Sequence, residues 1–175
     1  ELGDVPAENM EKYAKLYQKP VLGMRGENCK WCVMHYPTDG AAQAERMSTE
    51  QFEDYFFDVC AMDYSRMQAA LKPLKELMEK TDKVHVTGRG TDLTFSIKGM
   101  PAVPCAGEVN IPDGEIFAGP VLDSVNGVIT YNTTAYFDGV AFENICFHFE
   151  NGRIVEATAN DTERLNQILD RDEGC

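Results

Sequence analysis

The sequence predicts a mixed α/β fold, in which a part built from helices and strands is followed by a mainly antiparallel β part. Early in the chain, apolar residues recur at three- and four-residue spacing, which is typical of amphipathic helices. Later, short alternating runs separated by glycines or by Asn-Gly indicate strands. Residues 99–114 hold three glycines and three prolines, which favours a passage between lobes. We therefore expect an α/β lobe over residues 1–100 and a β-rich lobe over residues 101–175.

The first expected helix covers residues 6–18, because its apolar side chains fall on one face. Pro20 is expected to end this helix, since proline lacks the amide hydrogen that a helix interior requires. The run 31–36 is rich in apolar residues and stops before Pro37, which is typical of a strand.

A second helical region is predicted to begin at Ser48. Gln51 stands three residues after it, which is a capping-box pattern. Met47 and Phe52 are placed on either side of this start as a hydrophobic staple. A helix start at this position is therefore indicated by two independent signals.

The apolar spacing of this region continues to Lys80, but Pro73 must kink or divide it, so two helical segments are expected. Short strands follow, several of them with alternating apolar and polar residues. The expected strands cover residues 83–87, 92–97, 127–131, 145–150 and 153–157.

The strongest turn signal is Asn151-Gly152, which favours a type I′ hairpin between the last two strands. After this hairpin a final helix is expected, with its N-cap at Asn160 or Asp161 and its end around Arg171. Its apolar residues share one face, so this helix should cover the neighbouring strands.

Composition and charge exclude several classes of protein. The chain has 175 residues and a net charge of −13, which repels nucleic acid and anionic membrane surfaces. No apolar run approaches the roughly 20 residues that a membrane-spanning helix needs, so a soluble chain is expected. Its six cysteines lie far apart in a sequence rich in core residues, which favours a reduced, cytoplasmic protein. The N-terminal residues show neither a signal pattern nor an initiating Met, so we expect the numbering to begin inside a longer protein.

The cysteine and histidine residues give little support for a metal site by themselves. Cys29 and Cys32 have the spacing of half a zinc site, yet no second such pair and no histidine cluster completes it. We interpret Cys32 as a small buried core residue. His35, His85 and His148 stand singly on expected strands and are interpreted as ordinary surface or hydrogen-bonded side chains.

Glu115 is the candidate metal ligand. It follows a Pro-Asp-Gly turn in residues 110–117 and precedes apolar residues, so its carboxylate should be held on rigid backbone at the entrance of a strand. A fixed carboxylate suits a divalent ion, and it equally suits a simple salt bridge.

Four stretches, taken in order along the chain, resemble the thermophilic metalloaminopeptidase family, of the aminopeptidase T, aminopeptidase S and PepS type. They are GTDLTFSIKG at 90–99, NIPDGEIFAGPVLDSVNGVI at 110–129, FHFENGRIVEATA at 147–159 and LDRDEG at 169–174. The stretches KWCVMHYPT at 30–38 and MSTEQFEDYFF at 47–57 also look like the middle region of that family. The resemblance thus covers nearly the whole chain.

This resemblance implies a cytoplasmic homodimer that releases N-terminal amino acids from peptide substrates with two divalent metal ions, zinc or cobalt. Glu115 matches the first metal-binding glutamate of the family, and it is the one functional residue that carries over. The resemblance implies that the other ligands lie beyond residue 175. We therefore expect an interior fragment with no catalytic residues of its own, which binds no ion stably and is inactive alone.

Two other interpretations remain open at the level of sequence. The chain could be a non-catalytic module for dimerisation or for shaping a substrate entrance, with Tyr136, Phe142, Phe147 and Phe149 buried against a partner. It could also be a hydrolase that uses Glu108 and Glu115 as a carboxylate pair, which requires the two side chains to lie within about 5 to 10 Å of each other.

Overall fold

The chain folds into two compact units that interleave along the sequence. The computed structural model describes residues 5–137 and 139–170. One unit combines Glu1–Lys75 with Val103–Phe117, and the other combines Glu76–Ala102 with Ala118–Cys175. The predicted fold class is confirmed, because helices dominate the first part and an antiparallel sheet dominates the second. The predicted lobes 1–100 and 101–175 stay a prediction.

The first unit begins with consecutive helical turns, labelled α1 (Ala7–Tyr13), the π-helix η1 (Ala14–Gln18) and α2 (Lys19–Asn28). The prediction that Pro20 ends the helix is wrong. Pro20 is the second residue of α2 and directly follows the π turn η1, and the helical backbone runs through this position. The widened π turn before it, in which the Lys19 amide donates to the Ala14 carbonyl, lets the helical backbone continue.

Helices α3 (Asp39–Ala44) and α4 (Thr49–Cys60) form a small apolar cluster of their own. Ser48 is the N-cap of α4 and accepts a hydrogen bond from the Gln51 amide, as predicted. Phe52 and Phe56 are buried beside Ala42, and Met47 packs against them, so the staple is also confirmed.

Helix α5 (Tyr64–Lys80) follows α4 after a short break. Two helical segments are present, as predicted, but the expectation that Pro73 divides them is wrong, because the break lies at residues 61–63 and Pro73 lies inside α5. The Asp63 carboxylate explains the position of the break, because it accepts hydrogen bonds from the Ser65 and Arg66 amides and so starts a new helix.

Two short strand pairs complete the first unit. Strand β1 (Val33–Met34) pairs in parallel with β5 (Asn110–Ile111), and β4 (Val103–Cys105) pairs antiparallel with β6 (Glu115–Phe117). β1 is shorter than the predicted strand 31–36. Its partner strand stops at Pro112, which has no amide to donate to a ladder, and this limits the pairing.

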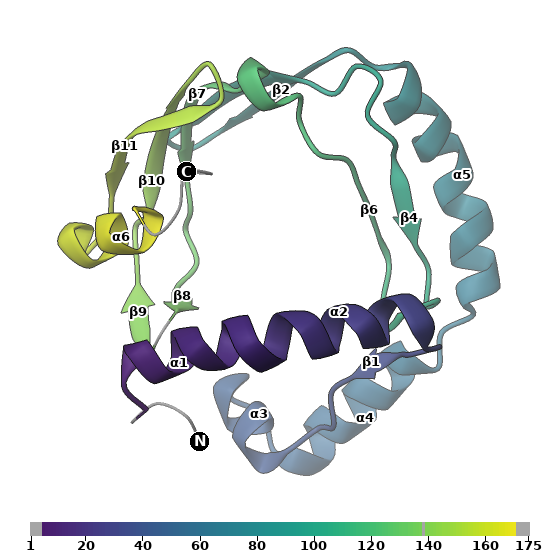
Figure 1. Cartoon of the computed structure of the whole chain (residues 1–175). Helices are drawn as coiled ribbons and strands as arrows, with labels where there is room; N and C mark the ends of the chain where they lie inside the picture. The colour runs from purple at the N-terminus through teal and green to yellow at the C-terminus, as the bar shows by residue number, and fades with distance from the viewer. Residues whose placement is uncertain (1–4, 138, 171–175) are drawn as a thin grey trace. The chain divides into compact units, whose positions relative to one another are not determined.

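The second unit is built on one antiparallel sheet of five strands, in the order β11-β10-β7-β3-β2 (Figure 1). The predicted strands are all present. They are β2 (Lys83–Gly88), β3 (Thr91–Ser96), β7 (Asn126–Thr130), β10 (Cys146–Glu150) and β11 (Arg153–Thr158). Asn151 and Gly152 both have positive φ, as the predicted type I′ turn requires.

A 3-10 turn η2 (Leu122–Ser124), a hairpin of β8 (Ala135–Phe137) and β9 (Val140–Phe142), and helix α6 (Thr162–Leu169) complete this unit. Asp161 is the N-cap of α6, as predicted, and Leu165 is buried. The predicted helix end at Arg171 lies outside the described residues. Of the four aromatic residues of the module interpretation, Phe142 is 2% exposed and so is not available to a partner, whereas Phe147 and Phe149 are partly buried and Tyr136 is exposed.

Within residues 5–137 and 139–170, no helix is both long enough and apolar enough to cross a membrane.

Candidate metal-ligand site

Glu115 is the first residue of β6, directly opposite Cys105 of β4 in the antiparallel register. Its side chain is exposed. Among the described residues, its carboxylate accepts no hydrogen bond and forms no ion pair, whereas other acidic groups nearby are engaged. The structure therefore gives no support to the salt-bridge interpretation of Glu115.

The loop that leads to Glu115 is closed by the side chain of Asp113. Its Oδ2 accepts a hydrogen bond from the Gly107 amide at 2.7 Å, and its Oδ1 accepts one from the Gly114 amide at 2.9 Å. Oδ2 thus ties the beginning of the loop to its end, and Oδ1 restrains the turn just before Glu115.

Helix α5 holds this loop from the outside. The Asp113 amide donates to Tyr64 Oη at 3.3 Å, and Tyr64 Oη donates to the Val59 carbonyl at 3.3 Å. Gly107 lies so close to the Tyr64 ring that a Cβ atom there would come within 2.8 Å of it. Gly114 has φ +136, and a Cβ atom would come within 3.1 Å of the Met67 side chain. The loop therefore needs glycine at both positions, for close approach and for positive φ.

Glu108 forms a further tie between the loop and α5. Its Oε2 accepts from the Ala106 amide at 2.8 Å, and its Oε1 accepts from Gln68 Nε2 at 3.2 Å. One oxygen is occupied by the loop and the other by α5, so Glu108 is a loop-stabilising residue. This arrangement does not favour a catalytic carboxylate pair of Glu108 with Glu115.

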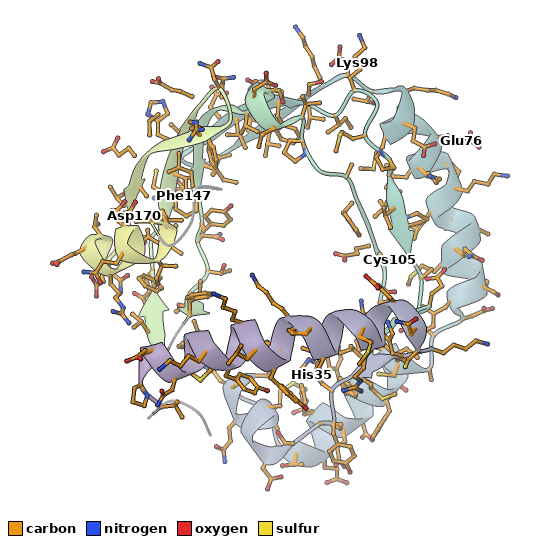
Figure 2. All side chains as sticks on the ribbon, viewed as in Figure 1. His35, Glu76, Lys98, Cys105, Phe147 and Asp170 are labelled. Carbon is orange, nitrogen blue, oxygen red and sulfur yellow. The ribbon has the colours of Figure 1, made fainter. Side chains whose placement is uncertain are left out.

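Glu115 also lines a cavity of about 600 Å³ in the first unit. His35 lies on its wall, just after β1, and Figure 2 labels it together with Cys105 of β4. The remaining wall is mostly apolar or backbone. The cavity is lined by Val33, His35, Val59, Asn110, Ile111, Pro112, Asp113, Gly114 and Glu115.

The electrostatics around Cys105 show that negative charge gathers at this end of β4. Partial burial raises the pKa of the Cys105 thiol, and the nearby carboxylates of Asp113, Glu115 and Glu108 raise it further. Burial is the larger cause, and the three carboxylates add to it because a further negative charge beside them is disfavoured.

The donor set itself is incomplete. No group of three or more His, Cys, Asp or Glu side chains in the described part of the chain is arranged to hold a metal ion. Protein metal sites use three or more ligands together with an oriented outer shell. Glu115 thus fits the role of one oxygen ligand, and the described residues do not fit a whole metal site.

Comparison with known proteins identifies the family. The model of the thermophilic metalloprotease family (M29) matches residues 3–175. The chain belongs to this M29 family.

Two curated proteins and one solved structure are also similar to the chain. The chain is 30% identical to aminopeptidase AmpS of Bacillus subtilis over 70% of its own length and 34% of that protein. It is 32% identical to aminopeptidase T of Thermus thermophilus over 53% of its own length and 25% of that protein. The solved structure of wild-type AmpT from Thermus thermophilus has the same fold over 99% of the chain, with a TM-score of 0.74 and 23% identity.

The matched part of this M29 chain spans 34% of aminopeptidase AmpS. In the structural comparison it covers 49% of the AmpT chain. Family membership therefore supports the resemblance inferred from the four sequence blocks. It leaves the role of Glu115 and the activity of the whole protein to be proposed.

The other candidate residues of the M29 chain are not drawn into the site. Cys29 and Cys32 are exposed and free, so the prediction that Cys32 is a buried core residue is wrong. β1 is too short to place Cys32 on a covered strand face. His85 pairs with Asp92 at 2.7 Å on the exposed edge of the sheet, as expected of a hydrogen-bonded surface histidine.

Sequence reasoning missed Asp113 and Tyr64, which the structure places around the Glu115 backbone. Asp113 had a local signal, since an Asp before Gly in a turn tends to bond nearby amides through its side chain. Tyr64 had none, because its contact with residue 113 joins positions that are far apart in sequence.

Proposed function

We propose that the chain is part of a metal-dependent aminopeptidase that releases N-terminal amino acids from peptides, and that Glu115 supplies one ligand to a pair of divalent ions, zinc or cobalt. The observation that carries this proposal is the contrast at residues 113 and 115. The Asp113 carboxylate is fully engaged in fixing the loop, while the Glu115 carboxylate is left without a partner among the described residues. Membership of a metalloprotease family and relatives that are aminopeptidases support it.

The chemistry of a carboxylate held in this way suits the role. A rigid backbone at the entrance of β6 lowers the entropy that is lost when the side chain binds an ion. Ions bound in such a pair supply a lowered pKa for a water molecule and polarisation of the scissile carbonyl. Residues 5–137 and 139–170 would contribute the Glu115 carboxylate to such a site, and they hold no group of three ligands of their own.

The first test is Glu115→Gln and Glu115→Ala in the complete enzyme. We expect the amount of zinc that stays bound after gel filtration to fall, because a ligand is lost, while the melting temperature of the metal-free protein stays unchanged. Glu156→Gln is the matched control, since Glu156 is an exposed glutamate on a strand of the other unit. Unchanged metal stoichiometry in the Glu115 variants would overturn the proposal.

The same reasoning predicts that the isolated chain of 175 residues is inactive. A single carboxylate cannot hold an ion against water, so amino acid amides with added zinc or cobalt should be hydrolysed no faster than in a blank with metal alone. Turnover above that blank, abolished by Glu115→Ala, would show that the chain holds a sufficient site by itself.

We also propose that the complete enzyme acts on peptides as a cytoplasmic homodimer and binds neither nucleic acid nor membranes. The net charge of −13 supports the last two points, because it opposes binding to polyanions. The free cysteines among the described residues support a reducing compartment. Sedimentation equilibrium of the complete enzyme tests the dimer, and a monomer mass would remove that part of the proposal.

A further inference from the structure

We infer that Asp113 is a positioning residue for Glu115, acting through the backbone of the loop between β4 and β6. The inference rests on the proposed function of Glu115 and adds a residue to it. Asp113 would not bind the ion itself. It would hold residues 107 and 114 together, so that the chain enters β6 in one direction and the Glu115 side chain leaves the loop at a fixed point.

The hydrogen bonds of Asp113 carry this inference first. Its two carboxylate oxygens accept from the Gly107 amide at 2.7 Å and from the Gly114 amide at 2.9 Å. Hydrogen bonds from amides to a charged carboxylate are about twice as strong as neutral ones. Because Gly114 directly precedes Glu115, one of these bonds restrains the amide of the residue before the proposed ligand.

The second support is the connection of Asp113 to the helices. Its own amide donates to Tyr64 Oη, and Tyr64 Oη donates to the Val59 carbonyl, so the loop is linked to α5 and to α4. The Tyr64 ring also lies against Gly107, where there is no room for a Cβ atom. The loop is thus fixed relative to helices of its own unit.

The third support is the division of roles between neighbouring carboxylates. An ionised carboxylate can accept hydrogen bonds on both oxygens. Asp113 uses both within the loop, and Glu108 uses one within the loop and one toward Gln68 of α5. Glu115 uses neither among the described residues. An outer residue that orients a ligand while making no bond to the metal is the usual second component of a metal site.

The experiment measures the zinc dissociation constant of the complete enzyme by competition with a chromophoric chelator. Asp113→Ala removes both hydrogen bonds, and we expect zinc to bind about 10- to 100-fold more weakly. Asp113→Asn keeps one acceptor oxygen, so its loss should be smaller than that of Asp113→Ala. Asp161→Ala is the matched control, because it removes the same charge and a carboxylate bond to the Arg164 amide in the other unit.

A double-mutant cycle separates positioning from general stabilisation. If Asp113 acts through Glu115, then Asp113→Ala made in a Glu115→Ala background should cause no further loss of zinc affinity. If the double variant instead loses zinc affinity by the full sum of the losses in Asp113→Ala and Glu115→Ala, the inference is overturned. If Asp113→Ala does not fold, the cycle is run with Asp113→Asn, and an affinity equal to that of the unchanged enzyme would also overturn it.

The two proposals fail in different ways. If Glu115→Ala binds zinc as tightly as the unchanged enzyme, the proposed function of Glu115 fails and the inference with it. If Glu115→Ala weakens binding while both Asp113 variants and Asp161→Ala leave the dissociation constant unchanged, only the positioning role of Asp113 is wrong.

Discussion

The loop between β4 and β6 and the hairpin between β10 and β11 both turn the chain with the help of glycines, but they are supported in different ways. The hairpin closes with two residues of positive φ, Asn151 and Gly152, and its strands lie in a five-stranded sheet. The 106–114 loop is closed by hydrogen bonds to the Asp113 carboxylate, and it packs against Tyr64 and Met67 of α5. The hairpin is also held from a distance, because the Asn151 amide donates to Asn126 Oδ1 and the Gly152 amide donates to the Val125 carbonyl. The two turns thus differ in what closes them, which is backbone conformation in the hairpin and a carboxylate side chain in the loop.

This difference extends to the cores. The sheet of the second unit is covered by a cluster in which Phe142, Ile145, Ala157 and Leu165 are all buried. Around the loop of the first unit, polar contacts take the place of such a cluster. We therefore expect substitutions in the sheet to act on the stability of the fold, and substitutions in the loop to act mainly on the position of Glu115.

The largest effect is expected for Gly127→Ala in β7. Gly127 has φ +112, and a Cβ atom there would lie 2.1 Å from the Asp92 carbonyl oxygen of the neighbouring strand. Because backbone must move, we expect the free energy of unfolding to fall by about 3 kcal/mol or more. Urea denaturation measures this loss.

Gly99→Ala is the control for that variant, since Gly99 also has positive φ but no atom lies within 4 Å of the added Cβ. It should cost only about 1 kcal/mol, the ordinary penalty for a left-handed backbone. Equal losses in the two variants would show that the strand contact is not what requires glycine at position 127.

A smaller effect on stability is expected for Gly107→Ala in the loop. The added Cβ would meet the Tyr64 ring, a side chain that can turn away, so the loss in unfolding free energy should be about 1 to 2 kcal/mol. Displacing Tyr64 breaks its bond with the Asp113 amide, so zinc affinity of the complete enzyme should fall more than in Gly139→Ala. Gly139 has φ +76 and open space around it. A stability loss as large as that of Gly127→Ala would contradict the contrast between the two regions.

The smallest effect concerns the start of α5, the helix that carries Tyr64. Hydrogen bonds, first from the Ser65 side chain and then from the Arg66 and Ser65 amides, lower the pKa of Asp63 below its usual 3.8, against a smaller opposing effect of burial. When the pKa of a carboxyl group is lower in the folded chain than in the unfolded chain, the group stabilises the fold at pH values above its pKa in the unfolded chain. This stabilisation is lost as the pH falls through the pKa of the group in the folded chain. The difference in stability between the unchanged chain and Asp63→Ala should therefore be constant from pH 6 to about pH 4.5 and narrow below pH 3.8. A difference that widens on acidification would contradict this assignment.

The sequence predicts the second unit better than the first, because most signals in the second unit come from residues close together in the chain. The Asn151-Gly152 turn, the alternation in β3 and the Asp161 cap depend on residues within a few positions of each other, so their signals are local. The Ser48 cap of α4 is predicted for the same reason.

The first unit is predicted less well where the outcome depends on competition between local signals or on remote partners. Pro73 is a strong helix breaker, yet the capping carboxylate of Asp63 places the break ten residues earlier. The length of β1 depends on β5, whose pairing ends at Pro112. Residue Glu115 stands out from its Pro-Asp-Gly context, but the Tyr64 and Met67 contacts that hold the loop cannot be found from spacing alone.

The interleaving of the two units has a consequence for dissecting this protein. Residues 103–117 belong by contact to the unit formed with Glu1–Lys75, yet both ends of this peptide are joined covalently to the other unit. A fragment that stops at residue 102 would lose β4 and β6, and a fragment that starts at residue 103 would carry Glu115 without the tyrosine and methionine of α5 that surround its loop. A cut near residue 102 therefore separates the acidic residue from the helices that support its loop, and grafting the site into another scaffold would require two pieces of sequence, residues 59–67 and 103–117.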